Sequence, residues 1–431
     1  MSASNNAVNV IDKLLDGFDS HPNNQHKDES KTAEKPENSS NEATNGLATQ
    51  QNISAATGYD KAQQSVYVVS EELPKDTPIV KGPDFNKSRS IDYILNAFRG
   101  TGFQASNLAF AVDRINEMIH WRMSEEDAKK PEHADMTQQE VKDARCTIFL
   151  GFTSNQVSSG NREVIRYLCE HNMIDCIVTT CGAIEEDIMK CYNPHYMGKF
   201  GLKGKDLRLK GQNRIGNLIV PNKNYCKFED FLTPILFKML EEQRANKDIV
   251  WTPSKLIRRI GKEINNKESV WYWCYKNDIP VFCPAITDGA VGDILYFMSY
   301  KDDGFILDIA RDIRLINDVS LNAIKSGMII LGGGVIKHHI CNANLMRNGA
   351  DYSVFINTGQ EFDGSDSGAK PDEAISWGKI KLDAKPVKVY GDATVFWPFV
   401  VSGTFAHPDH HKAAIKPKRK LNECYLIHEL K

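Results

Sequence analysis

The sequence predicts an α/β protein in which a parallel β-sheet is wrapped by helices. From residue 146 onward, short apolar runs typical of buried strands alternate with segments whose apolar residues recur at helical spacing. Such alternation builds a parallel sheet, because each helix carries the chain back across the sheet to start the next strand. Small and polar residues follow most of the apolar runs, as is common where ligands bind beyond the carboxyl ends of parallel strands.

The composition is that of an ordinary globular protein. The chain has 431 residues, of which 41% are hydrophobic, and its net charge of -3 argues against a protein that binds nucleic acid or a membrane surface. No apolar run approaches the roughly 18 residues of a transmembrane helix, and the N-terminus lacks the basic and apolar regions of a secretory signal. The ten cysteines include no C-x-x-C pair, so we expect reduced thiols in a cytoplasmic protein.

Four parts are expected along the chain. Residues 1–63 are polar and predict a disordered extension, within which 8–18 predict a short helix that we expect to be transient. Residues 64–78 predict a tethered docking segment around an apolar patch, and residues 79–406 predict a folded domain. Residues 407–431 contain a basic run and predict a mobile basic tail, which is favoured over a nuclear localisation signal.

Each expected strand is a short apolar run bounded by turn residues or charges. The strands are expected at 146–150, 174–178, 281–283, 328–331, 352–356 and 387–390.

Each expected helix repeats its apolar residues every three or four positions. The helices are expected at 91–98, 104–123, 161–171, 184–190, 228–242, 253–265, 268–277, 304–323, 337–348 and 394–405. The helix at 253–265 also has clear start signals, with Thr252 as a capping residue and Pro253 in the first position. Residues 124–144 predict a surface connection, and residues 193–227, rich in Gly and Asn, predict a long excursion without periodic structure.

Five of the expected strands are followed by small and polar residues. These segments lie at 151–160, 179–186, 284–293, 332–339 and 391–392. The carboxyl ends of parallel strands meet at one edge of the sheet, so we expect the five segments to converge on one site.

The glycine turn at 332–334 predicts close approach of the backbone to a phosphate group at the start of the following helix. The G-x-G-x-x-G pattern is absent, so a dinucleotide is indicated by the architecture rather than by a motif. Asp288 or Asp392 could accept hydrogen bonds from ribose hydroxyls. His338 and His339 form a candidate acid/base pair, and for one of the two we favour a structural role.

The stretch 363–379 has the composition of a site for an organic cation. Carboxylates such as Asp366 and Glu373 can pair with ammonium groups, and Trp377 can offer its ring to the same charge. In such surroundings Lys379 is a candidate for imine chemistry, provided that burial favours its neutral form. A solvated acidic turn followed by a surface lysine is the simpler alternative. The carboxylates lack the His and Cys spacing of a metal site, so an organic polycation fits better than a metal ion.

Taken together, these segments resemble the deoxyhypusine synthase family over about residues 65–406. The resemblance is carried by motifs at 153–155, 158–160, 185–187, 213–220, 261–265, 329–334, 344–351 and 363–379. It implies a Rossmann-like parallel sheet with helices on both faces that binds NAD. It also implies a homotetramer, built as a dimer of dimers with its sites at the dimer interface. In the family an N-terminal helix covers the neighbour's site, and residues 66–73 match that helix.

The resemblance further implies a reaction in two stages. NAD takes a hydride from spermidine to give an imine, and Lys379 exchanges onto that imine, which releases 1,3-diaminopropane and leaves the aminobutyl group on the enzyme. The group then passes to one lysine of the precursor of the translation factor that carries hypusine. The stored hydride reduces the new imine to deoxyhypusine.

By the same resemblance, Lys379 is the covalent lysine and His338 the proton shuttle. The residues that match the family's NAD segments are Ser154, Asn155, Gln156, Val157, Ser158, Thr180, Cys181, Gly182, Glu186, Asp288, Gly333, Thr358, Gly359, Asp392 and Ala393. The residues that match its spermidine-binding positions are Glu185, Glu186, Asp293, His338, Asn342, Gly364, Ser365, Asp366, Glu373, Trp377 and Lys379.

The sequence also departs from the family pattern at a few positions. Cys181 and Ala183 stand where the family usually has Ala and Gly, and Gln156 and Ala290 differ as well, which would affect contacts with NAD. Because the covalent lysine and the proton shuttle are present, we expect the catalytic type. The alternatives are a weakly active regulatory partner subunit of a hetero-oligomeric enzyme, and a homospermidine synthase. A non-catalytic NAD-binding module is disfavoured, because such a module would not require the Trp-Gly-Lys sequence at 377–379.

Overall fold

The computed structural model describes residues 58–417; the helix expected at 8–18 and residues 418–431 lie outside this range. The chain divides into two units between Ile79 and Val80, and each is described by itself. In the first unit, helix α2 (Gly58–Val66) buries none of its residues. Part of the extension expected to be disordered, from residue 58 to 63, is therefore helical. Its Ala, Gln and Lys residues favour a helix, and Asp60 lies in the first turn, where a negative charge is stabilising.

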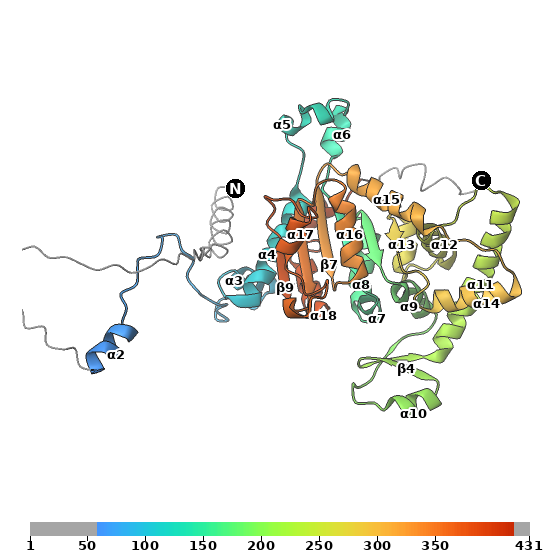
Figure 1. Ribbon diagram of the computed structural model, residues 1–431, viewed down its shortest axis with the longest axis horizontal. Helices are drawn as coiled ribbons and strands as arrows, with labels where there is room; N and C mark the ends of the chain where they lie inside the picture. The colour runs from blue at the N-terminus through green and yellow to red at the C-terminus, as the bar shows by residue number, and fades with distance from the viewer. Residues whose placement is uncertain (1–57, 418–431) are drawn as a thin grey trace, which may run out of the picture. The chain divides into compact units, whose positions relative to one another are not determined.

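The second unit is built on a six-stranded parallel sheet in the order β6-β2-β1-β7-β8-β9 (Figure 1). Its strands are β1 (Thr147–Phe152), β2 (Cys176–Thr179), β6 (Val281–Phe282), β7 (Ser326–Leu331), β8 (Tyr352–Asn357) and β9 (Val387–Tyr390). Every neighbouring pair runs parallel. The predicted α/β fold and all six predicted strands are confirmed.

The strand order reverses direction between β1 and β7. From β1 the sheet continues through β2 to the edge strand β6, and from β7 it continues the other way through β8 to β9. The register aligns the carboxyl ends, since Phe152 pairs with Thr179 on one side and with Leu331 on the other. Such a reversal opens a crevice at the carboxyl edge, which is where ligands bind in open α/β sheets.

Helices cover both faces of the sheet. Alternate strand residues belong to two separate apolar clusters, with Ile148 and Leu150 in one and Phe149 in the other. Helices α4 (Phe103–His120), α8 (Asn161–Glu170) and α18 (Ala393–Ser402) supply side chains to the first cluster. Helices α15 (Ile309–Leu321) and α16 (Val335–Leu345) supply side chains to the second. All residues of β1 and β7 are buried, which explains why these strands appear in the sequence as unbroken apolar runs.

Between residues 80 and 417, all ten expected helices are present, together with nine helices that were not expected. They are α3 (Ile91–Phe98), α4 (Phe103–His120), α5 (Glu125–Ala128), η1 (Pro131–His133), α6 (Gln138–Asp143), α7 (Asn155–Ser158), α8 (Asn161–Glu170), α9 (Cys181–Tyr192), α10 (Gly204–Leu209), α11 (Asn222–Ala245), α12 (Pro253–Ile264), α13 (Val270–Lys276), α14 (Ala290–Lys301), α15 (Ile309–Leu321), α16 (Val335–Leu345), η2 (Glu361–Asp363), α17 (Pro371–Ser376), α18 (Ala393–Ser402) and α19 (Pro408–Ala414). Thr252 accepts a hydrogen bond from the Lys255 N–H and caps α12, as predicted.

Helix α14 was not expected from the sequence. It buries a narrow stripe of Val291, Ile294 and Met298, while Tyr296 and Tyr300 stay exposed on its other side. Apolar residues all around a helix conceal the periodicity that marks its buried face.

The excursion at 193–227 is more regular than expected. It contains α10 and a three-stranded antiparallel sheet of β3 (Tyr196–Met197), β4 (Gln212–Ile215) and β5 (Leu218–Pro221), and Figure 1 shows β4 and α10 projecting away from the main sheet. A two-residue turn joins β4 to β5, with Gly216 at a φ of +57°. The strands are short and largely exposed, so they leave no clear pattern in the sequence.

Residues 407–417, expected to be part of a mobile tail, are instead folded onto the domain. Helix α19 ends at Ala414, which is 2% exposed, and Lys416 is buried beyond it. Lys416 forms an ion pair with Asp175 and donates a hydrogen bond to the Cys146 carbonyl at 2.7 Å. Polar residues and two adjacent histidines made this segment look solvated, but its last apolar and basic side chains are anchored in the domain.

Replacing Lys416 with alanine is expected to destabilise the protein by about 3–5 kcal/mol, because the buried Asp175 carboxylate loses its cation. Lys412→Ala, at an exposed position on helix α19 just before Lys416, is the matched control and should cost less than about 0.5 kcal/mol. Urea unfolding followed by tryptophan fluorescence measures both. Equal unfolding midpoints for the two variants would contradict the anchoring role.

Candidate active site

Backbone atoms form the floor of the crevice where β1 and β7 end. Gly332 and Gly334 follow β7 with φ angles of +101° and +61°, which residues with side chains rarely adopt. A Cβ atom on Gly332 would lie 3.0 Å from Thr153 Oγ1, and one on Gly333 would collide with Ser367. Helix α16 starts directly afterwards, so unpaired N–H groups lie at the same edge. This arrangement fits a phosphate group of a dinucleotide.

The first two predicted NAD segments touch one another in the structure. One contains Ser154 and helix α7 after β1, and the other runs from Thr180 to Gly182 after β2. The Ser154 N–H donates to Thr180 Oγ1 at 3.0 Å, and a Cβ atom on Gly182 would lie 2.9 Å from Ser154 Cβ. The close packing leaves room only for a glycine.

The other predicted NAD residues lie along the same edge. Thr358 and Gly359 follow β8, and Asp392 and Ala393 follow β9. Asp392 Oδ1 accepts a hydrogen bond from the Thr394 N–H at 2.8 Å and so caps α18. Of the two aspartates considered for a ribose, Asp392 thus already has a structural partner. Asp288 lies in the loop between β6 and α14.

On the β7–β8 side, α16 brings a histidine and a lysine to Asp366. His338 Nδ1 lies 3.7 Å from Asp366 Oδ1, and Lys337 donates a hydrogen bond to the Asp366 carbonyl. Asp366 Oδ2 is buried without a hydrogen-bond partner in the described structure. A carboxylate this close to an imidazole can help to orient the ring.

Lys379 and Trp377 lie on one turn after α17. Lys379 Nζ is 5.7 Å from the centre of the Trp377 ring, and Gly378 between them has a φ of +71°. Imine chemistry on Lys379 was predicted on the condition that the side chain is buried, and a surface lysine was the alternative; in the single chain Lys379 is only partly covered, and Trp377 is 64% exposed. Burial raises the pKa of the neighbouring Cys341 thiol to about 12, despite the nearby charges of Lys337 and Lys379.

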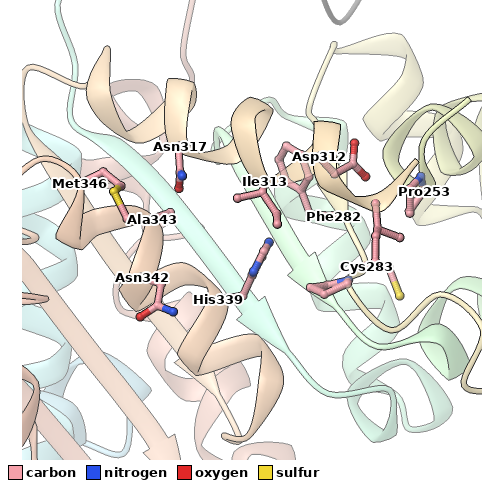
Figure 2. Close-up of a pocket in the computed structure, with 12 residues that line it drawn as sticks. Pro253, Phe282, Cys283, Asp312, Ile313, Asn317, His339, Asn342, Ala343 and Met346 are labelled. Carbon is pink, nitrogen blue, oxygen red and sulfur yellow. The ribbon is translucent and has the colours of Figure 1, made fainter. Parts of the chain in front are cut away.

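A separate cavity lies on the other side of α16. It has a volume of about 300 Å³ between the end of β6 and helices α15 and α16 (Figure 2). His339 and Asn342 line it together with Asp312 and Asn317. Burial, and then the charge of His338, lower the pKa of His339. The two histidines therefore do not act as a pair: His338 faces Asp366, and His339 lies in this cavity.

Glu185 and Glu186 are adjacent on α9 and only 6% and 5% exposed. Burial raises the pKa of each to about 7. Glu185 Oε2 accepts a hydrogen bond from the Val291 N–H at 3.3 Å, whereas Glu186 Oε2 has no partner in the described part of the chain. Two carboxyl groups that change charge near neutral pH suit a site for cationic amines.

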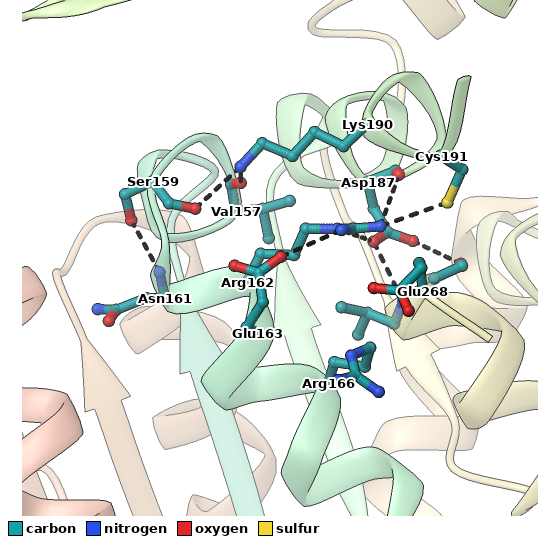
Figure 3. Close-up of polar contacts among 12 residues, drawn as sticks. Val157, Ser159, Asn161, Arg162, Glu163, Arg166, Asp187, Lys190, Cys191 and Glu268 are labelled. Atoms are coloured by element: carbon teal, nitrogen blue, oxygen red, sulfur yellow. Dashed lines mark hydrogen bonds and ion pairs between the residues drawn. The ribbon is translucent and has the colours of Figure 1, made fainter. Parts of the chain in front are cut away.

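A buried ion pair fixes the helix that carries these two glutamates. Arg162 Nε donates to Asp187 Oδ1 at 2.7 Å, and Asp187 also accepts hydrogen bonds from Ser269 Oγ at 2.6 Å and the Val270 N–H at 3.1 Å (Figure 3). One turn later, Lys190 donates to two backbone carbonyls in the segment of α7. Helix α9 is thereby held against α7, α8 and the start of α13.

Comparison with known proteins agrees with this geometry. Residues 93–404 match the family model for deoxyhypusine synthase. The deoxyhypusine synthase of Senecio vernalis is 55% identical over 364 residues, which cover 83% of this chain and 97% of the relative. A Dictyostelium discoideum relative with the same family name is 59% identical over 347 residues, which cover 80% of this chain and 91% of the relative. A solved Entamoeba histolytica protein assigned to deoxyhypusine synthase is 34% identical, with a TM-score of 0.56 over 76% of this chain and 97% of that one.

The chain belongs to the deoxyhypusine synthase family. The resemblance derived from the motifs is thus confirmed, and the function of the chain is that of a deoxyhypusine synthase. None of the helices between residues 58 and 417 has the length and apolar character that a membrane span requires.

The single chain does not assemble every residue that matches the family's spermidine-binding positions. Asp293 and Glu373 are exposed, as are Gly364 and Ser365 in the turn before Asp366. Nothing in the described residues brings Asp293 into contact with the turn that carries Lys379.

Sequence reasoning missed His195, which lies beside Glu186. Its side chain is 4% exposed, and its Nδ1 lies 3.8 Å from Glu186 Oε2. It belongs to the excursion at 193–227, where no periodic pattern indicated which residues point inward. A single histidine in such a segment cannot be recognised from the sequence as a buried residue.

Glu185→Gln is expected to stabilise the protein more at high pH than at low pH. The folded pKa of Glu185 is raised, so between about pH 4.5 and 7 the folded chain holds a proton that the unfolded chain loses, and stability falls as the pH rises. The neutral amide avoids this loss, so the variant should gain roughly 2 kcal/mol more at pH 8 than at pH 5.

Urea unfolding at the two pH values checks this expectation. Glu229→Gln, at an exposed position on α11, is the control and should change stability equally at both. A pH-independent effect of Glu185→Gln would show that the carboxyl group is charged across the whole range.

Proposed function

We propose that this chain catalyses the NAD-dependent transfer of the aminobutyl group of spermidine to one lysine of the hypusine-bearing translation factor precursor, through an imine on Lys379. The observation that carries the proposal is the position of Lys379 Nζ, 5.7 Å from the Trp377 ring on one glycine turn. This turn presents an amine nucleophile next to an aromatic face that suits cationic amines.

The crevice between β1 and β7 supports a dinucleotide. In our proposal Ser154–Ser158 and Thr180–Gly182 hold NAD, together with Gly333, Thr358, Gly359, Asp288, Asp392 and Ala393. The positive φ angles of Gly332 and Gly334 and the start of α16 directly after them support a turn whose backbone N–H groups bind a phosphate. When bound, NAD supplies the hydride acceptor that amine oxidation requires.

The chain's own groups have separate tasks in this proposal. Glu185 and Glu186, with Asp293, Asp366 and Glu373, bind the ammonium groups of the polyamine. Trp377 packs on its methylene groups. His338, oriented by Asp366 at 3.7 Å, moves the protons that imine exchange on Lys379 releases and consumes.

We also propose a cytoplasmic homotetramer, a dimer of dimers whose sites lie at the dimer interface. The exposure of Trp377, Glu373 and Asp293 in the single chain supports this arrangement, because a second chain could cover these residues and complete the site. The N-terminal segment around residues 66–73 would cover a neighbour's site.

Two alternative functions, a regulatory partner subunit and a homospermidine synthase, predict different activities for the purified chain. A regulatory partner subunit would bind the family's ligands but form little covalent product without a second homologue. A homospermidine synthase would transfer the aminobutyl group to putrescine in preference to a protein lysine. The buried carboxylates and the Lys379 turn serve all three, so activity decides among them.

The full chain, incubated with NAD and labelled spermidine and quenched with borohydride, is expected to carry an aminobutyl adduct on Lys379. Lys379→Ala should lose the adduct entirely, because only a primary amine can form the imine. Mass spectrometry of peptides locates the label.

Lys381→Ala is the matched control, since Lys381 lies two residues away but pairs with Asp351 at 2.6 Å. It should keep the adduct. A folded wild-type chain that binds NAD and forms no adduct would refute the proposal in favour of the partner subunit. Preferential transfer of the label to putrescine would instead identify a homospermidine synthase.

A further inference from the structure

His195 and Glu186 form a buried pair whose polar atoms lack partners. Their side chains are 4% and 6% exposed, and Nδ1 of His195 lies 3.8 Å from Oε2 of Glu186. Neither ring nitrogen of His195 nor this carboxyl oxygen has a hydrogen-bond partner in the described structure. Buried polar atoms are nearly always paired, so three unsatisfied atoms in one place point to a functional constraint.

The charged groups around the pair are already engaged elsewhere. Lys190 donates to the Val157 and Ser159 carbonyls at 2.6 and 2.9 Å, and Arg162 is paired with Asp187. Glu185, on the same helix as Glu186, accepts from a backbone N–H of α14.

Two further groups face the pair from neighbouring elements. Burial, and then the charges of Glu185 and Glu186, raise the pKa of Tyr225 on α11 to about 12, so its hydroxyl is neutral. From α7, the Ser158 side chain faces Glu186 and its backbone faces His195. The charge of Lys190 partly offsets the burial of Glu186, but its amine donates to the Val157 and Ser159 carbonyls and not to this carboxyl group.

A neutral imidazole suits a carboxyl group in both of its charge states, since it has one donor and one acceptor nitrogen. Burial, and then the charges of Lys190 and Arg162, lower the pKa of His195 to about 4, so its ring stays neutral at pH 7. Burial raises the pKa of Glu186 to about 7. At neutral pH the titrating proton thus belongs to Glu186.

We propose that His195 is a positioning residue for Glu186: its ring, 3.8 Å from the carboxyl group in the free site, donates a hydrogen bond to the Glu186 carboxylate when a cationic amine binds. The inference rests on the proposed function, in which Glu186 contacts the polyamine. Amine binding favours the carboxylate, so the proton of Glu186 passes to solvent, while the imidazole stays neutral.

The dissociation constant of spermidine, measured by calorimetry on the full chain between pH 6 and 8.5, tests this role. Affinity should rise through a midpoint near pH 7 as Glu186 ionises. His195→Leu removes the donor to the carboxylate, so the midpoint should move up by about one pH unit and Kd at pH 7 should increase about fivefold. His195→Gln keeps a donor and an acceptor and should restore the midpoint, which a purely structural role for the ring would not predict.

Glu186→Gln separates this inference from the function on which it rests. By itself it should weaken spermidine binding and leave only the pH dependence that Glu185 contributes, and adding His195→Leu should then have no further effect. Unchanged binding in Glu186→Gln would refute the assignment of Glu186 to the polyamine. Weakened binding in Glu186→Gln together with an unshifted midpoint in His195→Leu would overturn the role of His195 alone. His195→Phe provides the same comparison if His195→Leu does not fold, as judged by circular dichroism and gel filtration.

Discussion

The buried ion pair between Arg162 and Asp187 determines where the acidic part of the site lies. The two side chains are 5% and 0% exposed, and the Asp187 carboxylate also caps the start of α13 through Ser269 and Val270. One carboxylate thus joins three helices, and loss of either partner would leave an uncompensated charge in the core. Glu186 directly precedes Asp187 on α9. The position of α9 that allows Asp187 to pair with Arg162 therefore also fixes the positions of Glu185 and Glu186.

Opposite this acidic helix, the crevice is shaped by residues that lack side chains. Gly332 and Gly333 allow the end of β7 to approach Thr153 and Ser367 more closely than any Cβ atom would permit. The strand order reverses between β1 and β7. This reversal places the glycine backbone after β7 at the carboxyl edge of the sheet, where Glu186 and His338 also lie. Backbone suited to an anion and carboxylates suited to a cation therefore share one edge of the sheet, as the proposed reaction between a dinucleotide and a polyamine requires.

The sequence predicted the sheet and much of this edge for physical reasons. Strands buried on both faces appear as apolar runs, and glycines needed for close approach stand out after them. What it could not predict depends on contacts between distant segments. The inward position of His195 is set by an exposed hairpin region, and the separate surroundings of His338 and His339 follow from which face of α16 each occupies. Similarly, Lys416 appeared to belong to a charged tail, because nothing nearby in sequence reveals its partner Asp175.

The two halves of the site differ in how complete a single chain makes them. The glutamates of α9 are enclosed, so their carboxyl groups already feel a low dielectric. The turn with Trp377 and Lys379 is open, and an imine in contact with water is readily hydrolysed. Imine chemistry on Lys379 thus needs further protein or substrate surface to exclude water. This requirement is a physical reason to expect the sites of this family member at an interface between chains rather than within one.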